Sequence, residues 1–403
     1  MSLQKTMDNT ATPQTPPLSK SLVFTMATGA GLSVASIYYN QPMLGNIGTT
    51  FHADVSATGF IPTFTQVGYA LGILFLIPLG DRFDRRKVIA IKSLLLALAL
   101  FLCSIMPSLN NVLVASLAIG IMATMAQDIV PAAANLAPEA KRGKTVGTVM
   151  TGLLVGILLS RVISGAVSQY FGWQAMYQLA ALSILLIGLS LWRILPSFEV
   201  HSSLSYPGLL KSMLTLWKHH DELRRAAFAQ GLLSVGFSAF WSTLAVMLHT
   251  HYGLGSAVAG AFGLAGAAGA LAAPLAGTLA DKSGPARVTQ VGCAIFAVSF
   301  AIMFLLPYLP VNGQIVLIIV SALGFDLGIQ ATLVSHQSLV YGLDPTARGR
   351  LNALLFTGMF IGMSIGSVLG SQALALIGWN GVVAVATIAG ILAFIIRITD
   401  RSA

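Results

Sequence analysis

The 403-residue sequence predicts an all-α polytopic membrane protein with twelve transmembrane helices in two pseudo-symmetric six-helix bundles. Three observations predict this class: an apolar composition, an alternation of basic and base-free loops, and an internal repeat. Hydrophobic residues make up 56% of the chain and charged residues 9%, and the mean hydropathy is +0.82. Such values lie outside the range of soluble globular proteins.

The chain contains twelve apolar stretches of the length that a helix needs to cross a bilayer, about 20 residues. Six precede a long polar connection and six follow it. They cover 21–45, 57–79, 88–106, 111–137, 145–168, 174–195, 226–249, 256–280, 288–307, 313–340, 351–376 and 380–396. Pro42 is expected to break the first helix.

All but one of the 22 Lys and Arg residues lie in one alternate set of loops or at the helix ends beside them. The exception is Arg161, inside an apolar stretch. Basic loops stay on the cytoplasmic side, so both termini are predicted to be cytoplasmic, in a bacterial inner membrane. The formal charge of +9 is explained by these loops and by anionic lipid headgroups, and no nucleic-acid partner is expected.

The same pattern divides the chain into five parts. The predicted parts are a disordered cytoplasmic tail (1–20), an N-terminal bundle (21–195), a cytoplasmic linker (196–225), a C-terminal bundle (226–397) and a cytoplasmic C-terminus (398–403). In the linker, apolar residues recur at helical spacing and predict an amphipathic helix on the membrane surface. They are Leu209, Leu210, Met213, Leu214 and Trp217.

The two bundles repeat each other. Arg142-Gly143 recurs as Arg348-Gly349 and Gly172-Trp173 as Gly378-Trp379, each 206 positions later. Duplicated membrane bundles are typical of secondary transporters, whose halves rock about a site near the bilayer midplane. No Walker-type phosphate loop occurs, so nothing indicates an ATP-driven pump.

Two loops resemble a known family signature. Gly80-Asp81-Arg82-Phe83-Asp84-Arg85-Arg86-Lys87 follows helix 2, and its counterpart from Gly277 to Arg287 follows helix 8. Both resemble the signature G-x-x-x-D-[RK]-x-G-R-[RK] of the major facilitator superfamily, although the first copy has Ile77 and Asp84 where glycines are expected. Tyr38-Tyr39-Asn40-Gln41-Pro42 and Pro78-Leu79-Gly80-Asp81 look most like a bacterial branch near the twelve-helix drug:proton antiporters.

The basic loop has a physical interpretation of its own. Asp81 is expected to cap helix 3, whose first backbone N–H groups lack partners, and Arg85 is expected to reach Asp128 on helix 4. The resemblance implies that such a cluster latches one conformation; the alternative is a set of topology signals and headgroup contacts only. The predicted latch comprises Asp81, Arg82, Arg85, Asp128, Asp281, Lys282 and Arg287.

Two other antiporter signatures are damaged. The helix 4 arginine would fall at Ser116, and the helix 5 motif lacks its proline and both terminal glycines. Small residues nevertheless recur at every fourth position on helices 5 and 11, and further glycines lie on helix 8. Such ridges allow close helix approach in lipid, either as sliding contacts between the halves or as static packing. They are Gly152, Gly156, Ser160, Ser164, Gly358, Gly362, Gly366, Gly370, Gly260, Gly263, Gly266 and Gly269.

Three charged residues lie within the apolar stretches, where ionisable groups face a cavity or a partner. Asp326, in the middle of helix 10, is the predicted proton carrier, because burial favours the protonated form of a carboxyl group. Arg161 stays charged and is predicted to be a counter-charge or a substrate contact. The alternative is a fixed structural charge. Asp128 lies too far from Arg161 in depth to pair with it.

Further polar side chains are candidates for the substrate pathway, with interhelical hydrogen bonding or an interfacial aromatic belt as the alternative. They are Tyr38, Asn40, Gln41, Gln66, Tyr69, Gln127 and Trp241. His249 and His251 are expected to be solvated. Neither they nor Cys103 and Cys293 form a metal or disulfide pattern.

These observations predict a monomeric secondary transporter that exports small organic molecules, drugs or metabolites, in exchange for protons and without a cofactor or metal. The alternative within transport is a proton symporter that imports an organic anion bound at Arg161. A transport-inactive sensor or scaffold is a remote alternative. An enzyme is not expected, because no nucleophile–base pair stands out among the intramembrane residues.

Overall fold

The structure is a computed structural model that describes residues 19–198, 205–266, 282–344 and 347–399, and all regular elements within them are helices. Among these residues, ten helices are long and apolar enough to cross a membrane, or eleven if one bent pair counts as a single span. These coincide with eleven of the predicted stretches. The described part of the twelfth, Ser256–Gly266, is a shorter apolar helix, so the count of twelve stays a prediction.

The first half of the chain forms the helices of one bundle. They are α1 (Lys20–Ala35), α2 (Asn40–Phe51), α3 (Val55–Thr58), α4 (Phe60–Leu76), α5 (Leu79–Arg82), α6 (Arg85–Ser104), α7 (Leu109–Met122), α8 (Met125–Leu136), η1 (Glu139–Lys141), α9 (Arg142–Phe171) and α10 (Trp173–Ile194).

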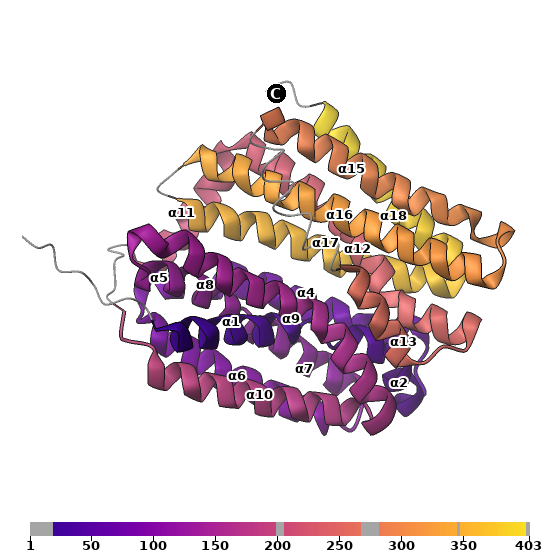
Figure 1. The fold of residues 1–403 in the computed structure, drawn as a ribbon, viewed down its shortest axis with the longest axis horizontal. Coiled ribbons are helices and arrows are strands. Elements are labelled where there is room, and N and C mark those ends of the chain that lie inside the picture. The colour runs from indigo at the N-terminus through magenta and orange to yellow at the C-terminus, as the bar shows by residue number, and fades with distance from the viewer. Residues whose placement is uncertain (1–18, 199–204, 267–281, 345–346, 400–403) are drawn as a thin grey trace, which may run out of the picture.

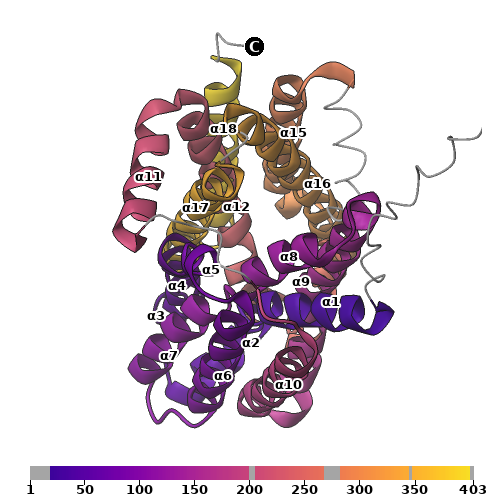
Figure 2. The same cartoon turned by 90° about the vertical axis from the view of Figure 1, so that its left-hand side faces the viewer.

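The second half forms α11, which follows the polar connection, and the helices of the other bundle. They are α11 (Tyr206–His219), α12 (Asp221–Tyr252), α13 (Ser256–Ala261), η2 (Phe262–Gly266), α15 (Pro285–Ala301), η3 (Ile302–Tyr308), α16 (Val311–Leu343), α17 (Arg348–Ile377) and α18 (Trp379–Ile398). Figures 1 and 2 show the two groups of helices side by side, with α5 and α11 at one end and α2 and α13 at the other.

The outer faces of the helices are apolar. On α6, Leu94, Leu98 and Phe101 follow one another at helical spacing and are about half exposed. Contiguous exposed apolar surface of this kind is rare on soluble monomers. It is the surface expected of a helix that faces lipid.

Two local expectations were wrong. Helix 1 bends by 41° between α1 and α2, at residues 36–39 rather than at Pro42, because Pro42 sits in the first turn of α2, where a missing N–H costs nothing. The third predicted span corresponds to α6, and its N-cap is Asp84, whose side chain accepts a hydrogen bond from Arg86 N at 3.0 Å. Asp81 instead belongs to the short helix α5 and pairs with Arg85.

The glycine ridges predicted on the fifth and eleventh spans lie on α9 and α17, and they pack within the halves. A Cβ atom at Gly156 would overlap the backbone of Gly31 on α1, and one at Gly362 would overlap Gly231 on α12. Because α1 and α12 belong to the same bundles as α9 and α17, these glycines pack inside each half, whereas other parts of α9 and α17 contact α13 and α4 of the opposite half.

The seam between the halves is formed by α4 and α3 with α17, by α9 with α13 and η2, and by α2 with α12 and α13. Near the α13 end, Ser256 donates to Gly165 O at 3.0 Å and Ala257 N donates to Gln169 Oε1 at 2.8 Å. Ser367 on α17 donates to Gly59 O at 2.9 Å. The halves are therefore hydrogen-bonded to each other at this end.

At the other end, α11 touches both halves. Tyr206 donates to Phe75 O of α4 at 2.9 Å, and Arg350 of α17 donates to Ser212 at 2.7 Å. Its Leu209, Met213 and Leu216 are buried, so α11 packs with its apolar face against the protein. Figure 2 shows α11 beside α12 and α17.

Candidate functional site

Arg161 lies on α9 where the two halves meet, and its side chain is buried. Its Nε donates to Gln41 Oε1 at 2.8 Å. Its guanidinium carbon lies 4.9 Å from the centre of the Tyr38 ring and 4.3 Å from that of Trp241, with Phe237 at 5.8 Å. Such contacts attract a cation to the faces of the rings. Since Tyr38 and Gln41 come from helix 1 and Trp241 and Phe237 from α12, both halves hold the arginine.

Asp326 lies in the middle of α16 and is also buried. Its charge and that of Arg161 act on each other, although the two side chains are not in direct ion-pair contact. η2 packs against both. A Cβ atom at Gly263 would lie 2.8 Å from Arg161 Cβ, and one at Gly266 would lie 3.3 Å from Asp326 Oδ2. Both buried charges therefore lie against η2, in the part of the chain predicted to begin helix 8.

Several buried polar atoms around this pair have no hydrogen-bond partner among the described residues. They are Arg161 Nη2, Asp326 Oδ2, Gln41 Nε2 and Trp241 Nε1. Buried polar groups are nearly always paired in proteins, and an unpaired one costs about 1–3 kcal/mol. Four such atoms, on Arg161, on two side chains that contact it and on the nearby Asp326, indicate a site completed by water or by a bound polar molecule.

The other predicted pathway residues form interhelical hydrogen bonds. Gln66 of α4 bonds Ser238 of α12 at 3.1 Å across the seam. Gln127 of α8 donates to the Tyr69 hydroxyl at 3.3 Å, and the Tyr69 ring lies 4.4 Å from that of Phe360 on α17.

Asn40 donates to Thr65 at 3.1 Å. The structure therefore brings Tyr38, Gln41 and Trp241 directly to Arg161, and places the remaining candidates around the seam.

The predicted latch has a different pairing from the one expected. Arg85 donates to Asp81 at 2.9 Å and to Gly80 O at 3.0 Å. The partner of Asp128 is Lys92 of α6, whose Nζ lies 2.6 Å from Asp128 Oδ2, and both side chains are almost fully buried. Lys92 lies close to the basic loop and is one of the bases assigned to helix ends, so its position in the sequence does not indicate this partner.

The rest of the latch is exposed or outside the described residues. Arg82, Lys282 and Arg287 are exposed, and Asp281 lies outside the part of the chain that the structure describes. His249 and His251 are exposed as well. Within the described residues, no group of three metal-ligating side chains occurs.

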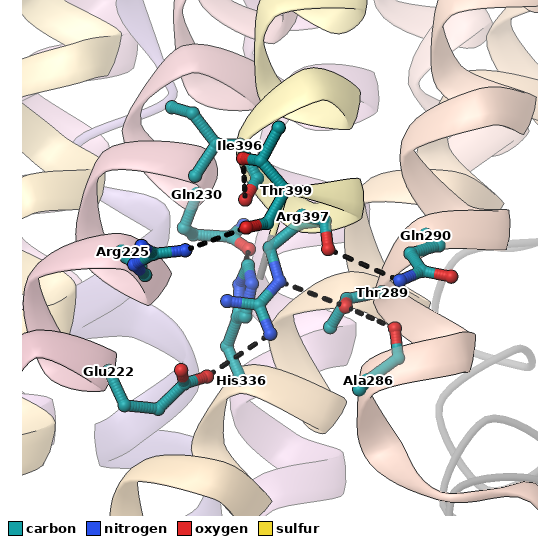
Figure 3. A network of polar contacts seen from close by, with 10 residues as sticks. All are labelled: Glu222, Arg225, Gln230, Ala286, Thr289, Gln290, His336, Ile396, Arg397 and Thr399. Carbon is teal, nitrogen blue, oxygen red and sulfur yellow. Dashed lines mark hydrogen bonds and ion pairs between the residues drawn. The ribbon is translucent and has the colours of Figure 1, made fainter. Parts of the chain in front are cut away.

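A second polar cluster lies inside the C-terminal half, where α12, α15, α16 and α18 meet (Figure 3). Arg397 donates to Glu222 at 3.1 Å and to Thr289 at 3.2 Å. Close by, His336 Nδ1 lies 3.1 Å from Gln230 Oε1. Sequence reasoning missed this cluster, because Arg397 stands at a helix end like the topology-setting bases. It lies within one half and not at the seam.

The fold and the site together define a polytopic membrane transporter with a buried charged site between two helical halves. The Major Facilitator Superfamily profile matches residues 26–343, and the chain belongs to that superfamily.

Two curated relatives cover most of the chain. It is 38% identical over 375 residues to the uncharacterized transporter YgaY of Escherichia coli O157:H7, covering 92% of this chain and 94% of that protein. It is 31% identical over 371 residues to the probable transporter SCO4007 of Streptomyces coelicolor, covering 90% and 83%.

Solved structures show the same fold. A bacterial homologue of the human lysosomal transporter Spinster, in an inward-facing and unoccupied conformation, superposes with a TM-score of 0.73 at 15% identity, covering 96% of both chains. The xylose transporter XylE from E. coli, in a partially occluded inward-open conformation, gives 0.71 at 14% identity, covering 95% and 98%. These likenesses concern the fold alone.

Proposed function

We propose that this superfamily member is a proton-coupled secondary transporter of small organic molecules. Asp326 carries the proton and Arg161 contacts the substrate. The observation that carries the proposal is the placement of two buried opposite charges at the seam, beside polar atoms that lack partners. A site between two halves is exposed to either side of the membrane in turn when the halves rock.

The proposed orientation puts both termini and α11 in the cytoplasm of a bacterial cell, with the protein in the inner membrane as a monomer. The basic loops support it, because Lys and Arg near helix ends stay on the cytoplasmic side. In this orientation, the hydrogen bonds of α13 with α9 close the periplasmic end. The Asp81–Arg85 and Lys92–Asp128 pairs would then lie toward the cytoplasm, where a latch acts.

Two modes of coupling are candidates. Export in exchange for protons follows from the resemblance to drug:proton antiporters, and it requires substrate and proton to compete for the site. Import of an organic anion together with protons requires both to bind at once. The unpartnered Nη2 of Arg161 favours the second mode, since it offers a positive donor to an anion.

Inside-out vesicles with an acidified lumen and a pH-sensitive dye test the proposal. Organic acids, neutral compounds and organic cations are added in turn. An exchanged compound dissipates the lumenal acidity, whereas a compound that enters the lumen with protons increases it. Asp326→Asn is expected to abolish either signal.

The matched control is Asp54→Asn, an exposed carboxyl whose capping bond to Ala57 N an asparagine retains. It is expected to behave as the wild type. Wild-type proton movement in Asp326→Asn, with the variant present at the wild-type level in the vesicles, would show that Asp326 is not the proton site.

A further inference from the structure

The free polar atoms around Arg161 are mainly hydrogen-bond donors. Arginine and the tryptophan indole can only donate hydrogen bonds, so Arg161 Nη2 and Trp241 Nε1 are two donors without an acceptor. The Gln41 side chain already accepts from Arg161 through Oε1, so its unpartnered Nε2 is a third donor. A molecule that pairs with these donors must present acceptor atoms.

The aromatic faces of the site are already occupied. Tyr38 and Trp241 would be good contacts for a cationic ligand, but the guanidinium of Arg161 lies over both rings. A cation placed here would also meet the positive charge of Arg161. The arrangement therefore disfavours an organic cation and favours an anion with at least two acceptor atoms, which a guanidinium binds well.

We propose that the transported molecule is a small organic acid whose carboxylate is held by Arg161, Gln41 and Trp241 while Asp326 carries a proton. The inference rests on the proposed function for the roles of Asp326 as proton site and of Arg161 as substrate contact. It deepens that function by committing to an organic acid and to joint binding of the acid and the proton.

The sign follows from charge balance. With Asp326 ionised, the site is neutral, and a carboxylate would give the buried site a net negative charge. With Asp326 protonated and neutral, the carboxylate of the bound acid balances the positive charge of Arg161 instead. Anion binding and proton uptake therefore strengthen each other, and by linkage the effect is reciprocal. Among the described residues, the charged or titratable groups that interact with Asp326 are Arg161 and Tyr38, and Gly266 of η2 adds none.

The experiment measures binding to the purified full-length protein with nine probes. Three apolar bodies (butyl, phenyl and naphthyl) are each used as a carboxylate, an amide and an amine. Binding is followed by thermal stabilisation and by proton uptake in weakly buffered solution. At least one carboxylate is expected to bind about 10–100-fold more tightly than its amide, and the amines are expected to bind no better than the amides.

The carboxylate is expected to bind more tightly as the pH falls from 8 to 6, by up to tenfold per pH unit, the limit for uptake of one proton. Amide binding should not depend on pH. Each bound carboxylate should take up as much as one proton.

Two variants separate the roles of the site residues. Trp241→Phe keeps the ring and removes the indole donor, so it should weaken carboxylate binding about 3–10-fold with little change for the amide. Asp326→Asn should bind the carboxylate independently of pH and without proton uptake. Asp54→Asn is the control for both.

The outcomes distinguish the substrate class from the proton site. If no carboxylate binds better than its amide, or if an amine binds best, the substrate class is wrong, even where proton movement still depends on Asp326. If a carboxylate binds selectively but Asp326→Asn keeps the pH dependence and the proton uptake, the proposed proton site is wrong, and with it the proposed sign of coupling at Asp326.

Discussion

The buried ion pair between Lys92 and Asp128 gives the sharpest test of the structure, because the sequence alone did not suggest it. Its atoms lie 2.6 Å apart, and the two side chains are 4% and 2% exposed. Removing one partner leaves the other charge buried, which typically costs 3–5 kcal/mol. We therefore expect Lys92→Met and Asp128→Asn each to destabilise the protein strongly.

The size of each effect depends on pH in opposite directions. In Lys92→Met, the Asp128 carboxyl has lost its ion-pair partner and avoids a buried unpaired charge by taking up a proton. For a reference carboxyl this costs about 4 kcal/mol at pH 7 and about 2 kcal/mol at pH 5.5. In Asp128→Asn, the isolated amine must lose a proton, at a cost of about 5 kcal/mol at pH 7 and about 3 kcal/mol at pH 8.5. The first variant should recover in acid and the second in base.

The assay uses Cys103 and Cys293, which are both free and buried. A thiol-reactive fluorescent dye labels such residues only when the protein unfolds, so it reports the melting temperature at a fixed heating rate. Each single variant should melt several degrees below the wild type. The double variant Lys92→Met/Asp128→Leu should recover most of the loss, because replacing both members of a buried pair by apolar groups is often neutral or stabilising.

The surface pair of Asp221 and Arg224 supplies the control. Asp221 is 80% exposed, and exposed pairs contribute about 1 kcal/mol or less, so Asp221→Asn should change the melting temperature little. If the double variant is as unstable as the two single losses combined, or if both single variants respond to pH in the same direction, the buried pair is not formed as described.

The remaining predictions concern the packing of each half and the seam. Arg397→Met should lower the melting temperature because it removes a buried cation from two polar partners, whereas Arg193→Met, at an exposed position in the last turn of α10, should not. Gly362→Ala should destabilise by about 1–3 kcal/mol through overpacking against α12, and Gly349→Ala, which meets no atom within 4 Å, should be neutral or stabilising by the same thermal assay. Gln169→Leu should speed amide exchange in the first turn of α13, which loses its acceptor, while Gln169→Glu should not; equal exchange in all three proteins would contradict the seam contact.

The helices could be predicted from hydropathy because a segment in lipid must satisfy its own backbone, which leaves little choice but a helix. Helix boundaries at Gly172 and Gly378 were also visible in the sequence, since both glycines separate two spans and both adopt positive φ, 87° and 82°. Such features are local. The bend of helix 1 was misplaced because proline is compatible with a first turn, and only packing decides where the turn begins.

Pairings between distant residues could not be predicted in the same way. Glycine spacing on α9 and α17 indicates close approach in lipid, but a ridge does not specify which neighbouring helix it meets. A lysine near a helix end can also extend its side chain back to the membrane interface. The position of Lys92 alone therefore did not indicate a buried partner. Only the packing of α6 against α8 places the amine of Lys92 on Asp128 instead.

The glycines of helix 8 join the candidate site to the contact between the halves. A Cβ atom at Gly260 would overlap the backbone carbonyl of Arg161, one at Gly263 would press on the stem of the same arginine, and one at Gly266 would approach Asp326. Three successive turns of one ridge therefore touch the seam, the positive charge and the negative charge. Any movement that separates α13 from α9 must also change the surroundings of Arg161. The proposed binding of substrate at Arg161 therefore acts on the same helix contact that joins the halves at the α13 end.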